Sequence, residues 1–160
     1  MTADFAFKSL LLLPVIAFPF IYLIGRASVR LNTRNTGTQR NPAKWIALFV
    51  MLLLVIPLVI VVKQFTAQGP FSTFIGSIEL KMDGVGILMS IVVVLMSLAV
   101  VLFSDHYMSH EVGEEKYYAL LVCMTGMVMG MVTSTDLFNL WVWFEAMAIT
   151  PYILVAFYHD

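Results

Sequence analysis

The sequence predicts an all-α, polytopic membrane protein of about five transmembrane helices, and three observations carry that prediction. The 160-residue chain is 61% hydrophobic and only 12% charged, whereas a soluble domain carries about 25% charged residues. A core of this size cannot bury so much apolar surface, so lipid must cover the excess. Five stretches are long and apolar enough to cross a bilayer, which takes about 20 residues per helix.

The five stretches are separated by polar or charged segments. They cover residues 5–25, 45–62, 85–103, 117–132 and 137–158. The first contains Pro14 and Pro19 and is followed by Arg26 without a small-residue cleavage site, so we expect a retained helix rather than a signal peptide. Only the polar tetrad 133–136 separates the last two, which predicts a tight antiparallel hairpin of helices.

The connecting segments differ in composition. Residues 26–44 are expected to form a solvated loop that carries five cations, and the third loop is acidic. In the second loop, apolar Ile78, Leu80 and Met82 alternate with charged neighbours. A period of two predicts a short strand, one half of a surface β-hairpin between the second and third helices. The charged residues of the first and third loops are Arg26, Arg30, Arg34, Arg40, Lys44, Asp105, Glu111, Glu114 and Glu115.

Lysine and arginine residues predict the orientation in the membrane, because cytoplasmic loops are enriched in them. With five spans, the first loop, the third loop and the C-terminus share one side, which holds the five cations of residues 26–44 and Lys116. The opposite side holds only Lys8, Lys63 and Lys81. We therefore expect the N-terminus outside and the C-terminus in the cytoplasm.

Composition also argues against several function classes. The net charge of −1 and the lack of a basic stripe give no reason to expect nucleic acid binding. The single cysteine, Cys123, lies in an apolar run and offers no disulfide framework. His106 and His110 have a spacing that holds a metal on a helix, with only Asp105 or Glu114 as a further ligand. We favour a solvated membrane-edge segment and expect no metal.

Glu145 is the ionisable residue that lies deep in a predicted span. Counting from Leu137 at about 1.5 Å per residue places it about 12 Å into the membrane, near the midplane. A charged side chain there costs about 2.5–3.5 kcal/mol on insertion scales, so such residues mark ion pathways or pair with a buried cation. The alternative is a neutral glutamic acid hydrogen-bonded to a neighbouring helix. We favour the pathway, with a counter-charge from another chain, because no lysine of this sequence is placed at midplane depth.

Two aspartates precede predicted helices and have two interpretations. Asp136 precedes the fifth helix and Asp83 the third. An aspartate at an N-cap satisfies free backbone amides and interacts favourably with the positive helix end. We favour capping at both positions, and a secondary role in an ion pathway stays open.

Glycine and proline positions predict how the helices pack and bend. Gly126 and Gly130 form a G-x-x-x-G motif, which allows close helix packing. The methionines around it suggest an adaptable packing face rather than copper ligands. Pro151 lies in the fifth helix six residues after Glu145 and should kink or loosen it. Broken helices near buried charges recur in transporters, although Pro57 in the second helix has no charge near it.

The segment Asp-Leu-Phe-Asn-Leu-Trp-Val-Trp-Phe-Glu, residues 136–145, resembles the fifth-helix signature of the antiporter-like proton-translocating subunits. These occur in respiratory complex I, membrane-bound hydrogenases and multisubunit Na⁺/H⁺ antiporters. Met-Asp-Gly-Val-Gly at 82–86, Leu-Phe-Ser-Asp-His-Tyr-Met at 102–108 and Lys-Tyr-Tyr-Ala-Leu-Leu at 116–121 agree in order, as does the surface hairpin before Asp83. The resemblance covers nearly the whole chain.

The resemblance implies a role for Glu145 and an incomplete bundle. In that family the glutamate of this helix pairs with a lysine on the seventh helix, and changes in the pair drive proton movement. Family members have about fourteen helices, so residues 1–160 resemble their first five as a single transmembrane domain. The resemblance also implies an energy-converting membrane, which we expect to be a bacterial cytoplasmic membrane.

Two functions follow from the resemblance. The first is an N-terminal part of an antiporter-like subunit that contributes Glu145 to proton or Na⁺ translocation, with a separate chain carrying the remaining helices. The second is a truncated relative that serves as a non-conducting structural or assembly subunit. Both imply other membrane subunits and lipid as partners and at most a non-redox role without a cofactor. An independent five-helix carrier is disfavoured, because it lacks the paired repeats and second ionisable group expected of one.

Overall fold

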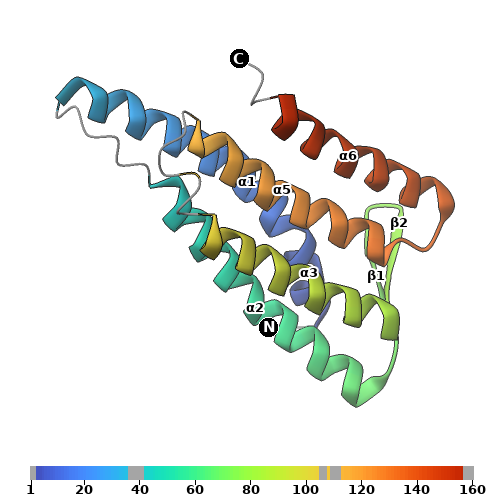
Figure 1. Ribbon diagram of the computed structural model, residues 1–160. Helices are drawn as coiled ribbons and strands as arrows, with labels where there is room; N and C mark the ends of the chain where they lie inside the picture. The colour runs from blue at the N-terminus through green and yellow to red at the C-terminus, as the bar shows by residue number, and fades with distance from the viewer. Residues whose placement is uncertain (1–2, 36–41, 105–107, 109–112, 157–160) are drawn as a thin grey trace.

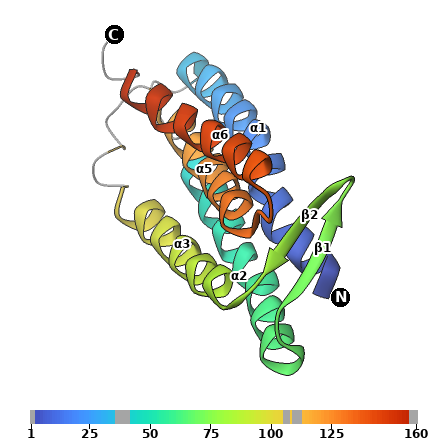
Figure 2. The same ribbon diagram turned by 90° about the vertical axis from the view of Figure 1, so that its right-hand side faces the viewer.

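The computed structural model describes residues 3–35, 42–104, 108 and 113–156 (Figures 1 and 2). Within these residues, five helices are long and apolar enough to cross a membrane, and a two-stranded sheet lies between the second and third of them. The elements are α1 (Ala3–Asn35), α2 (Ala43–Gln68), β1 (Phe71–Ile75), β2 (Ile78–Met82), α3 (Gly84–Phe103), α5 (Glu114–Thr133) and α6 (Leu137–Ala156). The predicted fold class is confirmed.

Helix α5 is the centre of the bundle. It packs against α1, α2, α3 and α6, and 56% of its most apolar stretch is buried. The side chains around it are mainly aliphatic, and Tyr118 is fully buried among them. Its hydroxyl group accepts a hydrogen bond of 3.1 Å from Ser104 Oγ, which satisfies the polar end of the ring. The outer surfaces of the other helices carry exposed Leu, Ile, Val and Phe side chains, as expected of a surface covered by lipid.

Two helices are longer than predicted. Helix α1 continues to Asn35, so Arg26 and Arg30 lie on the helix and not in a loop. Helix α2 continues past Lys63 to Gln68, where Gly69 adopts a φ of 79° and donates its N–H to Phe65 O. The prediction ended each helix with its apolar run. A helix needs no apolar residues once it leaves the lipid, and Arg, Lys and Gln are good helix formers in water.

The other boundaries lie close to their predicted positions. Helix α3 begins one residue early, and α5 begins at Glu114, so the acidic pair Glu114 and Glu115 forms its first turn. Carboxylates are favourable at that positive helix end. Helices α5 and α6 are joined by residues 134–136 as the predicted antiparallel hairpin. Several predicted positions lie outside the described residues. They are Arg40 of the first loop, Asp105 and Glu111 of the third loop, and the last predicted residues of the fifth helix.

The predicted β segment is a hairpin at one end of the bundle (Figure 2). Ile75 pairs with Ile78, which leaves Gly76 and Ser77 as a two-residue turn, and Gly76 has the positive φ of 62° that such a turn requires. The expected alternation places Leu80 and Met82 in the core, while Ile78 is exposed near the turn.

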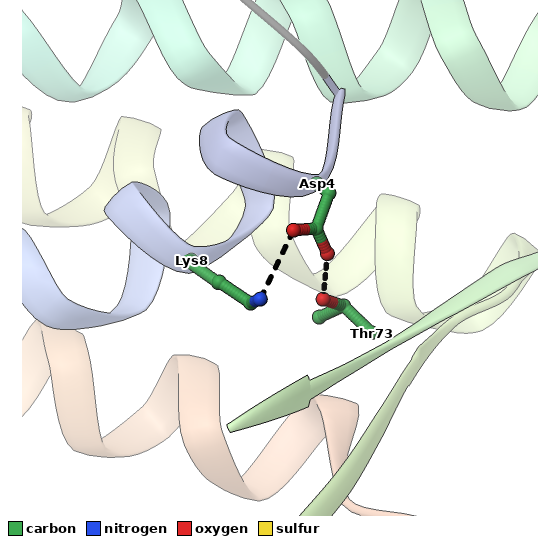
Figure 3. A network of polar contacts seen from close by, with 3 residues as sticks. All are labelled: Asp4, Lys8 and Thr73. Atoms are coloured by element: carbon green, nitrogen blue, oxygen red, sulfur yellow. Dashed lines mark hydrogen bonds and ion pairs between the residues drawn. The ribbon is translucent and has the colours of Figure 1, made fainter. Parts of the chain in front are cut away.

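Contacts on two sides hold this hairpin to the helices. On β1, the Phe71 ring packs edge-on against Phe7 of α1. The Thr73 hydroxyl donates to Asp4, which also pairs with Lys8 (Figure 3). On β2, Leu80 forms a β-bridge with Ser134 in the α5–α6 turn. The hairpin therefore connects the start of α1 to the start of α6.

Candidate functional site

Helix α6, which carries Glu145, lies on the outside of the bundle. Figure 1 shows it beyond α5, the element against which it packs. Only 11% of its most apolar stretch is buried, compared with 56% for α5. Since both helices are apolar, the difference comes from their neighbours and not from their composition. Most of the surface of α6 is therefore free to contact lipid or another protein.

The inward face of α6 follows one helical stripe. Asn139, Trp143 and Thr150 lie on it, and Asn139 and Thr150 are almost completely buried. Thr150 Oγ1 lies 3.6 Å from Met127 Sδ of α5 and 3.5 Å from the carbonyl oxygen of Ala146. This side of the helix is therefore committed to packing within the chain.

Glu145 lies on the opposite, outward face. It follows Trp143 by two residues, which is about 200° around a helix of 3.6 residues per turn. Its side chain is exposed, and it makes no ion pair or hydrogen bond within the described part of the chain. Its neighbours one turn away, Trp141, Val142 and Ile149, are also exposed, and none of them carries a charge.

Glu145 also lies midway along the helix. It follows Leu137 by eight residues, about 12 Å along the axis of a 20-residue helix. The lysines within the described residues lie toward helix ends or on β2, so none of them provides a cation at that depth. A carboxyl group in this position faces lipid in the isolated chain, which is an unfavourable environment for its charged form.

The two candidate aspartates both have capping geometry. Asp83 Oδ1 accepts a 2.8 Å hydrogen bond from the N–H of Gly86 at the start of α3. Asp136 Oδ1 accepts a 2.7 Å hydrogen bond from the N–H of Asn139 at the start of α6. Each bond joins the cap to a residue three positions later, as expected for an N-cap. Asp136 therefore fixes the first turn of the helix that carries Glu145.

Gly126 and Gly130 face different helices. A Cβ atom on Gly126 would lie 2.8 Å from Val15 Cγ2 and 3.2 Å from the carbonyl oxygen of Leu11, both on α1. A Cβ atom on Gly130 would lie 2.3–2.7 Å from three atoms of the Trp143 indole. The motif thus lets α5 approach α1 through one glycine and α6 through the other.

Pro151 lies within α6, which continues as a helix to Ala156. Proline has no N–H, so the carbonyl of Met147, four residues earlier, lacks its usual helical donor. That carbonyl is two residues beyond Glu145. Pro57, by contrast, is buried within α2.

Sequence reasoning did not separate the two faces of α6 and so missed Asn139 and Trp143. Both side chains carry a buried nitrogen atom, Nδ2 and Nε1, without a hydrogen-bond partner among the described residues. The sequence did contain a signal for this inward face, because the polar residue Asn139 lies one helical turn before Trp143 within an apolar run. It also missed the hydrogen bond of 2.9 Å from Thr125 Oγ1 to Ser97 Oγ, which joins α5 to α3.

The two histidines with metal-binding spacing, His106 and His110, lie outside the described residues. Among the residues that are described, no group of three or more His, Cys, Asp or Glu side chains is arranged to hold a metal ion.

Comparison with known proteins supports the resemblance stated above. Residues 70–118 match the family model described as NADH-ubiquinone oxidoreductase (complex I), chain 5 N-terminus, a segment that covers the hairpin, α3 and the start of α5. The chloroplastic NAD(P)H-quinone oxidoreductase subunit 5 of Adiantum capillus-veneris is 34% identical over 89 residues, 56% of this chain and 12% of that protein. The corresponding subunit of Chlorokybus atmophyticus is 27% identical over 169 residues, 97% of this chain and 25% of that protein.

A solved structure shares the fold. A chain of the membrane-bound sulfane sulfur reductase, an archaeal respiratory membrane complex, superposes with a TM-score of 0.78 at 22% identity. The match covers 92% of this chain and 29% of that chain. The chain therefore spans about an eighth to a quarter of the length of these two curated relatives, and it corresponds to an N-terminal portion of such proteins.

Proposed function

We propose that this chain, which resembles the N-terminal portion of the antiporter-like membrane subunits, contributes Glu145 to a path for proton or Na⁺ translocation in a multisubunit energy-converting membrane complex. The observation that carries the proposal is the position of Glu145, halfway along α6 on its outward apolar face and without a partner in the described chain. The relatives named above are NAD(P)H-quinone oxidoreductase subunits, and this likeness supports a role for the Glu145 carboxylate in ion translocation.

The counter-charge would come from a second polypeptide. An ionised carboxylate in lipid is unfavourable unless it is paired, so a lysine placed against the outward face of α6 would stabilise it. A separate chain that carries the remaining helices of a fourteen-helix subunit would supply that lysine in trans. This makes residues 1–160 one transmembrane domain that corresponds to the first five helices of such a subunit. Any redox chemistry would belong to partner subunits.

The surroundings proposed for the complex follow from the same resemblance. The membrane would be a bacterial cytoplasmic membrane, with the hairpin end of the bundle outside and the basic end in the cytoplasm. The basic end holds Arg26 and Arg30 of α1, Lys44 of α2 and Lys116 of α5, which agrees with the enrichment of cations on cytoplasmic sides.

The alternative is a non-conducting assembly subunit. The broad apolar outer face of α6 favours it, because such a face suits permanent packing against a partner helix. Glu145 would then be held neutral by a hydrogen bond in the assembled complex. The two functions differ in whether translocation depends on the charge at residue 145.

The test is Glu145→Gln in the assembled complex, with translocation measured as the pH gradient formed by inverted membrane vesicles. We expect translocation to fall at least about tenfold, because the glutamine cannot carry or exchange a proton. Glu79→Gln is the matched control, since it removes one carboxylate from the hairpin outside the lipid. Both variants should assemble normally on a native gel.

Unchanged translocation in Glu145→Gln, with the complex intact, would overturn the conducting role and leave the assembly role. A cross-link from Glu145→Cys to a cysteine placed at a partner's midplane lysine would locate the counter-charge. Repeating the vesicle assay with Na⁺ uptake measured in place of the pH gradient identifies the ion.

A further inference from the structure

A groove runs along the outside of the bundle between α1 and α2. Its volume is about 410 Å³, and apolar side chains such as Leu13, Ile16 and Ala17 of α1 and Val50 and Leu53 of α2 line it. Val50 is nearly buried at its base, while Ile16 and Leu53 are exposed along it. The groove is open to the lipid along its length and does not involve α6.

The α1 side of the groove has the length of one leaflet, and α2 contributes Val50 and Leu53 to the other side. Its lining extends along α1 from Phe5 to Ala17, about 18 Å at 1.5 Å per residue. Half of the hydrocarbon core of a bilayer is about 15 Å thick. One extended acyl chain that enters from the membrane surface would therefore fill it.

A charged pair lies beside the end of the groove near the start of α1. Lys8 lines the apolar groove with its aliphatic stem, and its Nζ lies 3.0 Å from Asp4 Oδ2 (Figure 3). The other carboxylate oxygen of Asp4 accepts the hydroxyl of Thr73 on β1, which fixes the pair at the hairpin end. The side chains of Lys8 and Asp4 remain 35% and 56% exposed, so both can still contact a ligand.

We propose that this groove binds one glycerophospholipid with an ammonium–phosphate headgroup of the phosphatidylethanolamine type. One acyl chain lies between α1 and α2, the phosphate faces the Lys8 ammonium, and the headgroup ammonium faces the Asp4 carboxylate. The ammonium and carboxylate of Lys8 and Asp4 are complementary in charge to the phosphate and ammonium of this headgroup. The groove shares no residue with those assigned to translocation, so its test is independent of Glu145.

The probe is phosphatidylethanolamine with a diazirine in its acyl chain, added to native membranes that contain the complex. After detergent washing that removes loosely held lipid, the sample is irradiated and cross-linked peptides are mapped by mass spectrometry. We expect retained label on the α1 and α2 residues that line the groove and little on Leu88 or Leu95, which are exposed on α3. Unlabelled phosphatidylethanolamine should compete, and phosphatidylglycerol, which lacks the ammonium, should compete poorly.

Two variants and one control make the site testable. Ala17→Trp fills the groove and should abolish retained label, and Lys8→Gln should lower it about fivefold through loss of one cation near the membrane surface. Leu23→Trp adds the same side chain on α1 outside the groove and should change nothing. The proposal would be overturned if the groove were labelled no more than α3, or if Ala17→Trp kept its full label. Equal competition by phosphatidylglycerol, or a protein subunit cross-linked in the groove, would also overturn it.

Discussion

At the residue scale, Gly130 determines how closely α5 and α6 approach each other. The Trp143 indole occupies the space where a side chain at position 130 would begin, with ring atoms 2.3–2.7 Å from an added Cβ. We expect Gly130→Ala to lower the free energy of unfolding by about 1–3 kcal/mol, because overpacking forces the ring or the backbone to move. Thermal unfolding of the purified complex in mild detergent measures the change.

The control for this variant is Gly84→Ala. A Cβ atom at position 84 would meet only Phe65 Cζ at 3.8 Å, an ordinary contact, so we expect little change in the unfolding midpoint. In a Trp143→Val background, Gly130→Ala should cost less than it does in the unchanged chain, as a double-mutant cycle would show. If Gly130→Ala is as stable as Gly84→Ala, the close approach between these helices is not required.

Asp136 gives a second prediction at this scale. Serine also caps helices but does not release and take up a proton near neutral pH. If Asp136 acts only through its hydrogen bond to Asn139 N–H, Asp136→Ser should retain both stability and translocation, while Asp136→Ala should lose about 1 kcal/mol of stability. The vesicle assay and thermal unfolding together check this. A loss of translocation in the stable serine variant would show that the carboxylate takes part in the path.

At the element scale, α6 has one face that packs on its own chain and one that is exposed. Its inward stripe packs on α5, and its outward face places Trp141 near Glu145. Large aromatic residues often dominate interfaces, and truncating such a residue commonly costs about 2 kcal/mol or more. We therefore expect Trp141→Ala to weaken retention of the partner chain about thirtyfold, at 1.4 kcal/mol per tenfold.

Copurification at increasing detergent concentration measures that retention. Trp45→Ala is the control, since Trp45 is also more than half exposed but lies at the start of α2 beside Lys44. Equal retention in both variants would mean that the outward face of α6 contacts lipid in the complex.

The elements differ in how well the sequence predicted them. The helix α3 was placed to within one residue, because Asp83 precedes the start of its apolar run and a polar segment follows the end of that run. The alternation of Ile78, Leu80 and Met82 predicted β2. The extra turns of α1 and α2 were missed, since hydropathy detects the lipid boundary and not the end of the helix.

At the scale of the whole molecule, the arrangement of the helices separates two ends. The hairpin, the start of α1 and the α5–α6 turn lie at one end, and the starts of α2 and α5 lie at the other (Figures 1 and 2). The second end holds most of the arginine and lysine residues within the described part of the chain. The side of the membrane that each end faces follows from this asymmetry as a prediction.

Single cysteines test the orientation in a Cys123→Ala background. We expect Ser77→Cys, at the hairpin turn, to react with a membrane-impermeant maleimide in intact cells. Arg30→Cys, near the basic end, should react only after the cells are permeabilised. Both positions are exposed in the structure, so a difference between them reports on the membrane and not on burial. The reverse pattern would place the basic end outside.

The sequence by itself determined that the chain forms a helical membrane bundle, where its apolar spans lie, and that Glu145 is a costly charge within one of them. These depend on composition and on local periodicity, which are properties of short stretches. Only the tertiary structure decided that Gly126 and Gly130 face different helices, that α5 is central, and that Glu145 points away from its own bundle. Those facts depend on which face of α6 meets α5, and that choice is made by packing between residues distant in the chain, such as Gly130 and Trp143.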